Sequence, residues 1–369
     1  MSADVLVIGA GIVGAALGYG LAQTGQRVVV LDGEDRDMRA ARANFGLVWV
    51  QGKGASAPAY HHLGRRSADL WPNFLKELTG NVGMKVDYSR RGGLIYCLGQ
   101  NEYEERDALN KRMHNQTVQA DTRMIDRAEL ERMMPAVDFG PEVVGASYCE
   151  ADGHVNPLQL LAALHRGIVN LGGTIHYRRR AETVTPKQDG FIVKAGSTSF
   201  AAPRVVVAAG LATPSLTDPL GLTIPLRSER GQLLVTERLA PLLPYPGSGL
   251  RQTADGTIMI GATKEETDDH GVSVSSATRL ALRATRTIPA LASAKIVRQW
   301  SGFRIIPPDG LPIYAESSEH PGLFAAVCHS GVTLAAVHAA IIAPAMLAGR
   351  LSDDMSAFSN GRFDVQKCA

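Results

Sequence analysis

A glycine-rich turn close to the start of the chain carries the clearest chemical signal. The residues of this turn are Gly9, Gly11, Ile12, Val13 and Gly14, in the spacing G-x-G-x-x-G. Glycines at these positions permit a tight turn, let the backbone approach a pyrophosphate, and allow a helix to pack closely on a strand. Asp32 ends the next apolar run, where a carboxylate can accept hydrogen bonds from a ribose. The pattern predicts a dinucleotide site and does not by itself distinguish NAD from FAD.

A second set of candidate residues is cationic and could hold a carboxylate. Arg304 follows Gly302 and Phe303 and precedes two isoleucines. A guanidinium binds a carboxylate through two parallel hydrogen bonds, which would fix the orientation of a bound amino acid. A surface salt bridge is the alternative, and the apolar neighbours of Arg304 disfavour it.

Two further cations border one predicted hairpin. Arg251 lies on its first side and Lys264 on its second, so both side chains could face the same cavity from neighbouring strand ends. A substrate with two carboxylates would need a second cation, and either residue could supply it. Charges solvated on the hairpin surface are the alternative, and Lys264 could instead assist electron transfer to dioxygen.

The segment from His329 to Leu334 precedes an apolar run that we expect to be helical to about Leu347. Gly331, Val332 and Thr333 would then lie at the helix N-terminus, where the helix dipole stabilises negative charge. His329 has two interpretations, a substrate contact or a packed histidine that hydrogen-bonds backbone.

Hydrophobic periodicity indicates the elements that position these residues. The turn lies inside a βαβ unit, with strands at 4–8 and 27–31 and a helix at 15–24. Other helices are predicted at 58–78, 101–135 and 158–171, strands at 190–194 and 204–208, and a hairpin at 83–100. Residues 224–300 alternate strand-like runs with turns, which is typical of an antiparallel sheet.

Composition excludes several classes of protein. The 38 basic and 36 acidic residues are spread along the chain, so we expect no nucleic-acid partner. No apolar run reaches the ~18 residues of a membrane span. The four cysteines form no C-x-x-C pair, so we expect no disulfide framework and no metal. The N-terminus lacks an export signal, which predicts a cytoplasmic protein.

Taken together, five parts of the chain resemble the FAD-dependent D-amino-acid oxidase superfamily. They are Gly9 to Gly14, Asp32, Val205 to Gly210, Gly302 to Pro312 and His329 to Gly331. The chain looks most similar to the glycine oxidase branch, which includes iminodiacetate oxidase and the flavin subunits of opine and D-hydroxyproline dehydrogenases. The resemblance implies an α/β fold: a Rossmann-like FAD-binding domain and a second, mainly antiparallel substrate domain. The first would combine residues 1–80, 145–215 and 300–369, and the second 81–144 and 216–299.

The resemblance also assigns roles to residues. It implies that Arg304 holds the substrate carboxylate, that the 331–333 helix start faces the flavin pyrimidine ring, and that a loop at 44–54 passes the flavin, with Trp49, Gln51 and Lys53 as further lining candidates. His329 stands where glycine oxidase carries an arginine. Beyond the turn and Asp32, the expected FAD contacts are Asn44, Phe45, Gly46, Leu47, Val184, Ala209, Gly210, Gly302, Arg304, Gly331, Val332 and Thr333.

The implied activity is oxidation of a small amino acid or secondary amine, of the iminodiacetate, sarcosine or glycine type. A hydride would pass from Cα to flavin N5, the imine would hydrolyse to an oxo acid such as glyoxylate, and dioxygen would be reduced to hydrogen peroxide. The alternative is the flavin subunit of a multi-subunit opine or D-hydroxyproline dehydrogenase, which passes electrons to a partner. A homo-oligomer is also compatible with the sequence.

Overall fold

Six strands that are far apart in the sequence form the largest sheet of the protein. The computed structural model describes residues 3–33, 39–116, 120–349, 351 and 353–368. The strand order is β18-β19-β13-β1-β2-β9, and every neighbouring pair is parallel except β18 and β19. These strands are β1 (Val5–Ile8), β2 (Val28–Leu31), β9 (Thr174–His176), β13 (Arg204–Val207), β18 (Ile313–Glu316) and β19 (Leu323–Val327). Each of the three segments predicted to form the FAD-binding domain contributes two of them, and the domain boundaries themselves stay a prediction.

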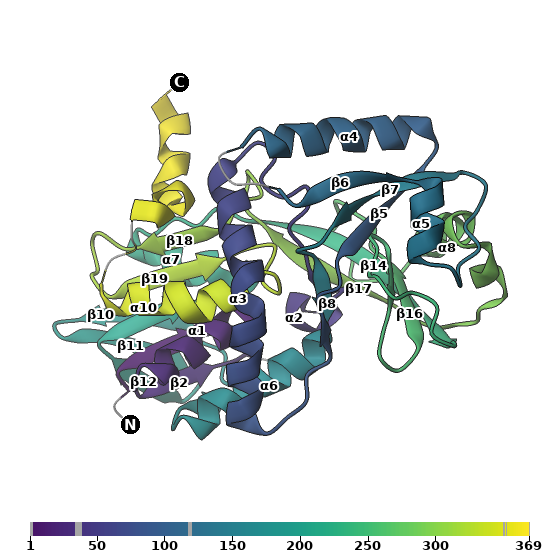
Figure 1. The fold of residues 1–369 in the computed structure, drawn as a ribbon. Coiled ribbons are helices and arrows are strands. Elements are labelled where there is room, and N and C mark those ends of the chain that lie inside the picture. The colour runs from purple at the N-terminus through teal and green to yellow at the C-terminus, as the bar shows by residue number, and fades with distance from the viewer. Residues whose placement is uncertain (1–2, 34–38, 117–119, 350, 352, 369) are drawn as a thin grey trace.

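Both faces of this sheet are buried, because successive side chains point in opposite directions. On β1, Val5 and Val7 join one hydrophobic cluster, whereas Leu6 and Ile8 join another. The first cluster packs against helices and the second against a small antiparallel sheet (Figure 1). The helices are α1 (Ile12–Gln23), α3 (Pro58–Val82) and α6 (Pro157–Asn170), and the small sheet comprises β10 (Thr183–Lys187), β11 (Gly190–Ala195) and β12 (Thr198–Ala202).

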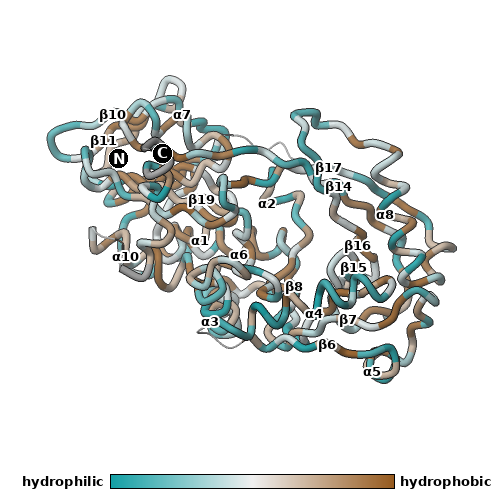
Figure 2. The backbone as a smooth tube through the Cα atoms, turned by 90° about the horizontal axis from the view of Figure 1, so that it is seen from above, coloured by the Kyte–Doolittle hydropathy of each residue, from teal (hydrophilic) through white to brown (hydrophobic). Residues whose placement is uncertain are grey.

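A second region lies beside the first in Figures 1 and 2 and is built on antiparallel strands. Its four-stranded sheet has the order β15-β16-β14-β17, and a three-stranded sheet, β5-β7-β6, joins it through a bridge between Leu94 and Gly247. The strands are β5 (Gly93–Leu98), β6 (Thr122–Asp126), β7 (Val143–Cys149), β14 (Arg227–Arg238), β15 (Leu250–Gln252), β16 (Thr257–Gly261) and β17 (Ile296–Ile306), and the helices are α4 (Gln100–His114), α5 (Arg127–Met133) and α8 (Val274–Thr287). The predicted fold class is confirmed.

Two local predictions were wrong. Residues 83–100 are not a hairpin, because β4 (Tyr88–Ser89) pairs with β8 (Gly153–Val155) while β5 pairs with β7. Residues 101–135 are not helical throughout, because β6 separates α4 from α5 and pairs with β7. In each case a strand finds its partner far along the chain, which a local pattern does not reveal.

The helix predicted after Gly331 is observed as α9 (Ala335–Val337), a π-helical turn (His338–Ile342) and α10 (Ala343–Leu347). Pro344, which has no backbone N–H to donate, lies two residues after the π-helical turn. The short elements that remain are α2 (Ala40–Ala43), β3 (Leu47–Val48), α7 (Thr213–Thr217) and 3-10 turns at Gly210–Ala212, Asp218–Leu220, Pro289–Ser293, Asp353–Phe358 and Asn360–Cys368. In the part of the chain that the structure describes, no helix combines the length and apolarity needed to cross a membrane.

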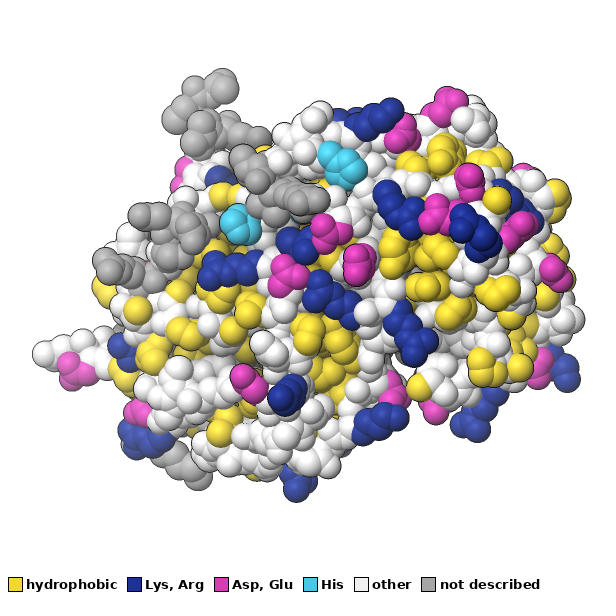
Figure 3. Space-filling model, viewed as in Figure 1, with side chains coloured by type: hydrophobic (Ala, Val, Ile, Leu, Met, Phe, Trp, Pro, Cys, Tyr) yellow, Lys and Arg dark blue, Asp and Glu magenta, His cyan; other side chains and the backbone are white. Residues whose placement is uncertain are grey.

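The surface carries charges of both signs. On the face shown in Figure 3, basic and acidic side chains are interspersed rather than gathered by sign. Ion pairs on the surface of the protein join distant segments; Arg283 pairs with Glu102, and Arg286 pairs with Glu142. Exposed pairs of this kind contribute little stability each.

Candidate functional site

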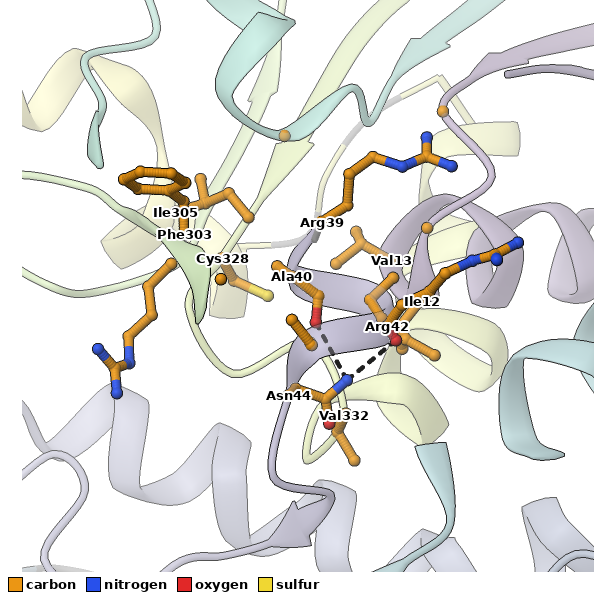
Figure 4. Close-up of a pocket in the computed structure, with 18 of the residues that line it drawn as sticks. Ile12, Val13, Arg39, Ala40, Arg42, Asn44, Phe303, Ile305, Cys328 and Val332 are labelled. Atoms are coloured by element: carbon orange, nitrogen blue, oxygen red, sulfur yellow. Dashed lines mark hydrogen bonds between the residues drawn. The ribbon is translucent and has the colours of Figure 1, made fainter. Parts of the chain in front are cut away.

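One large cavity, of about 840 Å³, is lined by residues of both regions. In Figure 4, Ile12 and Val13 at the start of α1 lie across the cavity from Phe303 and Ile305 on β17. Most of the residues predicted from the sequence line this cavity. They are Gly9, Gly11, Ile12, Val13, Asp32, Asn44, Phe45, Gly46, Leu47, Ala209, Gly210, Lys264, Gly302, Arg304, His329, Gly331, Val332 and Thr333.

The glycine turn is packed so closely that only glycine fits at two of its positions. Gly9 has a φ of +107°, and a Cβ added there would lie 2.3 Å from the carbonyl oxygen of Ala208. A Cβ on Gly14 would lie 1.9 Å from the carbonyl oxygen of Gly9, so Gly14 acts by packing α1 against the turn and does not itself line the cavity. At Gly11 the nearest atom to an added Cβ is Ala41 Cβ, at 3.6 Å, so this part of the backbone is open to a ligand.

The carboxylate of Asp32 lies beside the turn. This residue is 6% exposed and accepts a hydrogen bond from the backbone N–H of Ala10 at 3.2 Å. It also pairs with Arg39 at 2.6 Å, and the Arg39 side chain is 42% exposed, so this ion pair can rearrange at small cost. The carboxylate, the open backbone and the N-terminus of α1 together fit the ribose and pyrophosphate of a dinucleotide.

The loop after α2 is held by its own first residue. The side-chain amide of Asn44 donates to the carbonyl oxygens of Ala40 and Ala41, both at 3.0 Å, which Figure 4 marks. Its side-chain oxygen accepts the N–H of Gly46 at 2.9 Å. These bonds fix the direction in which the chain leaves α2, so that Phe45 and the following residues line the cavity.

The segment before α9 is fixed from behind by α3. The carbonyl oxygen of Thr333 accepts hydrogen bonds from Ser67 Oγ at 2.7 Å and from Trp71 Nε1 at 2.9 Å. The hydroxyl of Thr333 accepts the backbone N–H of Trp49 at 3.1 Å. This helix start is therefore a rigid part of the cavity wall.

Arg304 projects from β17 into the cavity wall and is already partly paired. Its Nη1 donates to Glu229 Oε1 at 3.1 Å, and its Nη2 donates to the carbonyl oxygen of Thr263 at 2.8 Å. The guanidinium lies against Gly231, where an added Cβ would be 2.7 Å from Nη2. Burial lowers the pKa of Arg304, and Glu229 acts in the opposite direction. A guanidinium has five N–H donors, so donors remain for a ligand.

His329 lines the cavity, and its side chain is exposed there. Desolvation by the surrounding walls lowers its pKa to about 3, the positive charges of Lys53, Arg304 and Lys264 act in the same direction, and the ring is therefore neutral. A neutral imidazole cannot supply the charge that an arginine would supply at this position. His329 is thus a polar lining residue rather than a second cation.

Sequence reasoning gave Lys53 only as a lining residue, and the structure gives it a defined position. Its ammonium donates to Ser330 Oγ at 2.7 Å and to Thr333 Oγ1 at 3.2 Å, and it lines the cavity. Burial lowers its pKa to about 8, while Asp152 and Cys328 act to raise it. No local signal could have found this contact, because its partners lie almost 300 residues away along the chain, at sequence separations of 277 and 280.

Besides Gly14, three predicted residues do not line the cavity: Gln51, Arg251 and Val184. Gln51 is 4% exposed, and its side-chain amide donates to Asp152 Oδ2 at 2.6 Å. Arg251 is 3% exposed, and its guanidinium donates to His154 Nδ1 at 3.2 Å and lies 5.8 Å from the centre of the Phe45 ring. It therefore stands behind Phe45, with its pKa lowered to about 10 by burial. Val184 packs into the cluster between the large sheet and β10–β12, so its side chain contributes to the core. Glu182, two residues earlier and directly before β10, lines the cavity instead.

The parallel sheet, the tight glycine turn beside Asp32 and a cavity continuing to Arg304 define a dinucleotide-dependent oxidoreductase. The family description "FAD dependent oxidoreductase" (DAO) matches residues 4–345, and the chain belongs to this family. Its members act on amino acids and amines, and FAD is the cofactor. The residues of the cavity fit this cofactor: the glycine turn and Asp32 could hold its adenosine diphosphate part, and the walls at 44–47 and 331–333, which line the same cavity, could hold its flavin.

Curated relatives cover almost the whole chain. The opine oxidase B subunit from Rhizobium meliloti is 43% identical over 99% of this chain and 98% of its own length. Glycine oxidase from Geobacillus kaustophilus (strain HTA426) is 26% identical over 96% of each chain. A crystal structure of glycine oxidase from Geobacillus kaustophilus superposes with a TM-score of 0.87 over 97% of this chain and 98% of that one, at 24% identity.

Proposed function

We propose that this chain is the flavin-bearing subunit of a multi-subunit dehydrogenase of the opine type. It would oxidise the C–N bond of a secondary amine that carries a carboxylate and would pass the electrons to a partner subunit. The structural observation that supports this proposal is the position of Arg304 in the wall of the cavity that also holds the glycine turn. The 43% identity to the B subunit of an opine oxidase favours a chain that works together with other subunits.

The residues of the cavity account for how such a substrate would be bound and prepared. Arg304 pairs with the carboxylate and fixes the orientation of the neighbouring carbon. The cations around His329 disfavour another positive charge, so they favour the neutral amine, whose lone pair assists departure of the hydride. His329, with its pKa lowered to about 3 by desolvation, stays neutral at physiological pH and does not compete with that amine for a proton.

When FAD is bound, it would supply the acceptor for the hydride, which carries both electrons of the oxidation. Water then hydrolyses the imine to an oxo acid and a smaller amine. The 44–47 loop and the 331–333 segment are fixed by hydrogen bonds, so they would form a rigid wall against which the substrate is positioned.

Anaerobic mixing of the holoprotein with candidate substrates tests the proposal. We expect an N-(1-carboxyalkyl) amino acid to bleach the flavin absorbance, and we expect a redox dye to restore it much faster than dioxygen does. Bleaching by none of the secondary or primary amino acids would refute it.

The second candidate is an oxidase that uses dioxygen itself. The likeness to glycine oxidase and the presence of Lys264 in the cavity wall favour it. Rapid reoxidation in air, with one hydrogen peroxide formed for each amine oxidised, would decide for this candidate and against an electron-accepting partner.

A further inference from the structure

The end of the cavity around His329 carries more positive than negative charge. Lys53, Lys264 and Arg304 all act on the pKa of His329. Arg304 is paired with Glu229 at 3.1 Å. Within the described part of the chain, neither lysine has a carboxylate oxygen within the 4.0 Å of an ion pair. After the Arg304–Glu229 pair is set aside, two positive charges remain to be balanced.

Lys53 is the more confined of these two lysines. It is held by two neutral hydroxyls, those of Ser330 and Thr333, whereas Lys264 is an exposed residue of the cavity wall. A confined charge without a counter-ion is stabilised more by a bound anion than a solvated charge is. The reason is that the confined charge has already lost its water on folding, whereas a solvated charge must lose it on binding.

The nearest buried acid does not neutralise Lys53. Asp152 is fully buried, and its carboxylate accepts hydrogen bonds from the backbone N–H of Val50 and the side-chain amide of Gln51, both at 2.6 Å. Burial raises the pKa of Asp152 to about 7, so at neutral pH it is only partly charged. Asp152 thus serves mainly to hold the 50–53 segment that carries Lys53.

We propose that Lys53 is a substrate-binding residue that pairs with the second carboxylate of a dicarboxylic secondary amine whose first carboxylate is held by Arg304. This assignment rests on the proposed function and specifies its substrate class as amino acids that carry a carboxyalkyl group on nitrogen. It gives Lys53 the role for which the sequence offered Arg251 or Lys264. Arg251 stands behind Phe45, outside the cavity lining, and Lys264 is solvated.

Two ethers, which have no amine to be oxidised, distinguish a carboxylate-binding role of Lys53 from a structural one. Oxydiacetate has one carboxylate on each side of its ether oxygen, and methoxyacetate has a single carboxylate. Binding of each to the holoprotein is followed by the perturbation of the flavin absorbance. The proteins compared are the natural chain, Lys53→Met, Lys53→Arg and Lys264→Met, each with its FAD content measured.

We expect the natural protein to bind oxydiacetate more tightly than methoxyacetate. Lys53→Met should weaken oxydiacetate binding by about 10- to 100-fold and leave methoxyacetate nearly unchanged, as expected for loss of one confined charge-assisted contact. Lys53→Arg should restore most of the preference, and Lys264→Met should change it by less than ~5-fold because that lysine is exposed.

Equal weakening of both ligands in Lys53→Met would overturn the assignment, since it would mean that Lys53 only braces the 330–333 segment. A preference unaffected by Lys53 would overturn it as well. Reduction of the flavin by secondary amines, measured in parallel, tests the proposed function separately. If amines with one and two carboxylates reduce it equally well, the function stands and the role of Lys53 falls. If no amine reduces it while oxydiacetate binding still depends on Lys53, the function falls and the carboxylate site stands.

Discussion

Removal of the Arg304 guanidinium is the most direct test of the site. A bound carboxylate would lose a charge-assisted contact, and truncating one partner of a buried charge pair costs about 2–5 kcal/mol. The Arg304 side chain is 20% exposed and shares its charge with Glu229, so the lower part of that range applies. With 1.4 kcal/mol for each factor of ten, about 2–3 kcal/mol corresponds to a ~30- to 150-fold rise in the Kd of a carboxylate ligand.

The assay is anaerobic flavin reduction by a secondary amine at increasing concentration, with Arg304→Ala compared to the natural protein. FAD content should be largely unchanged, because most of the residues expected to hold FAD, the glycine turn and Asp32 among them, lie on other elements than Arg304. The variant leaves Glu229 without its cation, so Arg304→Ala combined with Glu229→Gln separates a local folding defect from lost binding. Half-saturation at an unchanged substrate concentration in both variants would refute a carboxylate-binding role for Arg304.

Three further predictions concern other parts of the site. Gly14→Ala should abolish FAD binding, measured as the ratio of flavin to protein absorbance, because its Cβ would lie 1.9 Å from the carbonyl oxygen of Gly9. Gly64→Ala is the matched control and should bind FAD normally, because no atom lies within 4 Å of a Cβ added there. Oxydiacetate affinity should fall as pH rises through about 8, because Lys53 loses its proton, and Lys53→Met should show no such fall. The pKa of Asp152 is raised to about 7 in the folded protein, so the free energy of unfolding should decrease as pH rises from about 4 to about 7. Urea denaturation of Asp152→Asn should show no such decrease, and the same decrease in this variant would contradict the role of Asp152.

The sequence predicted those parts of the fold that depend on local order. The βαβ unit was confirmed because its strands, turn and helix follow one another directly, and the glycine spacing fixes how they pack. The antiparallel second region was also confirmed, since each of its strands carries its own alternation and turn residues. The hairpin at 83–100 was wrong because β4 and β5 take partners from the 143–155 segment, and no local pattern records that choice.

The candidate site divides in the same way. Arg304 and the glycine turn could be found because short motifs surround them, and both line the cavity. Arg251 was expected to face the cavity, but the direction of its side chain depends on His154 and Phe45, which come from other segments. Lys53 was predicted only as a lining residue for the same reason, since its contact with the 330–333 segment forms only in the folded chain.

The glycine turn and Arg304 line a single chamber. A dinucleotide bound along this chamber would form one side of the compartment for the smaller molecule, so that compartment would be complete only after the dinucleotide has bound. The freshly folded polypeptide should consequently be indiscriminate toward small acids, and selectivity should arise only upon maturation. When variants are screened for altered substrate preference, reduced FAD binding and changed substrate selectivity will therefore look alike. The FAD content of each variant has to be measured first.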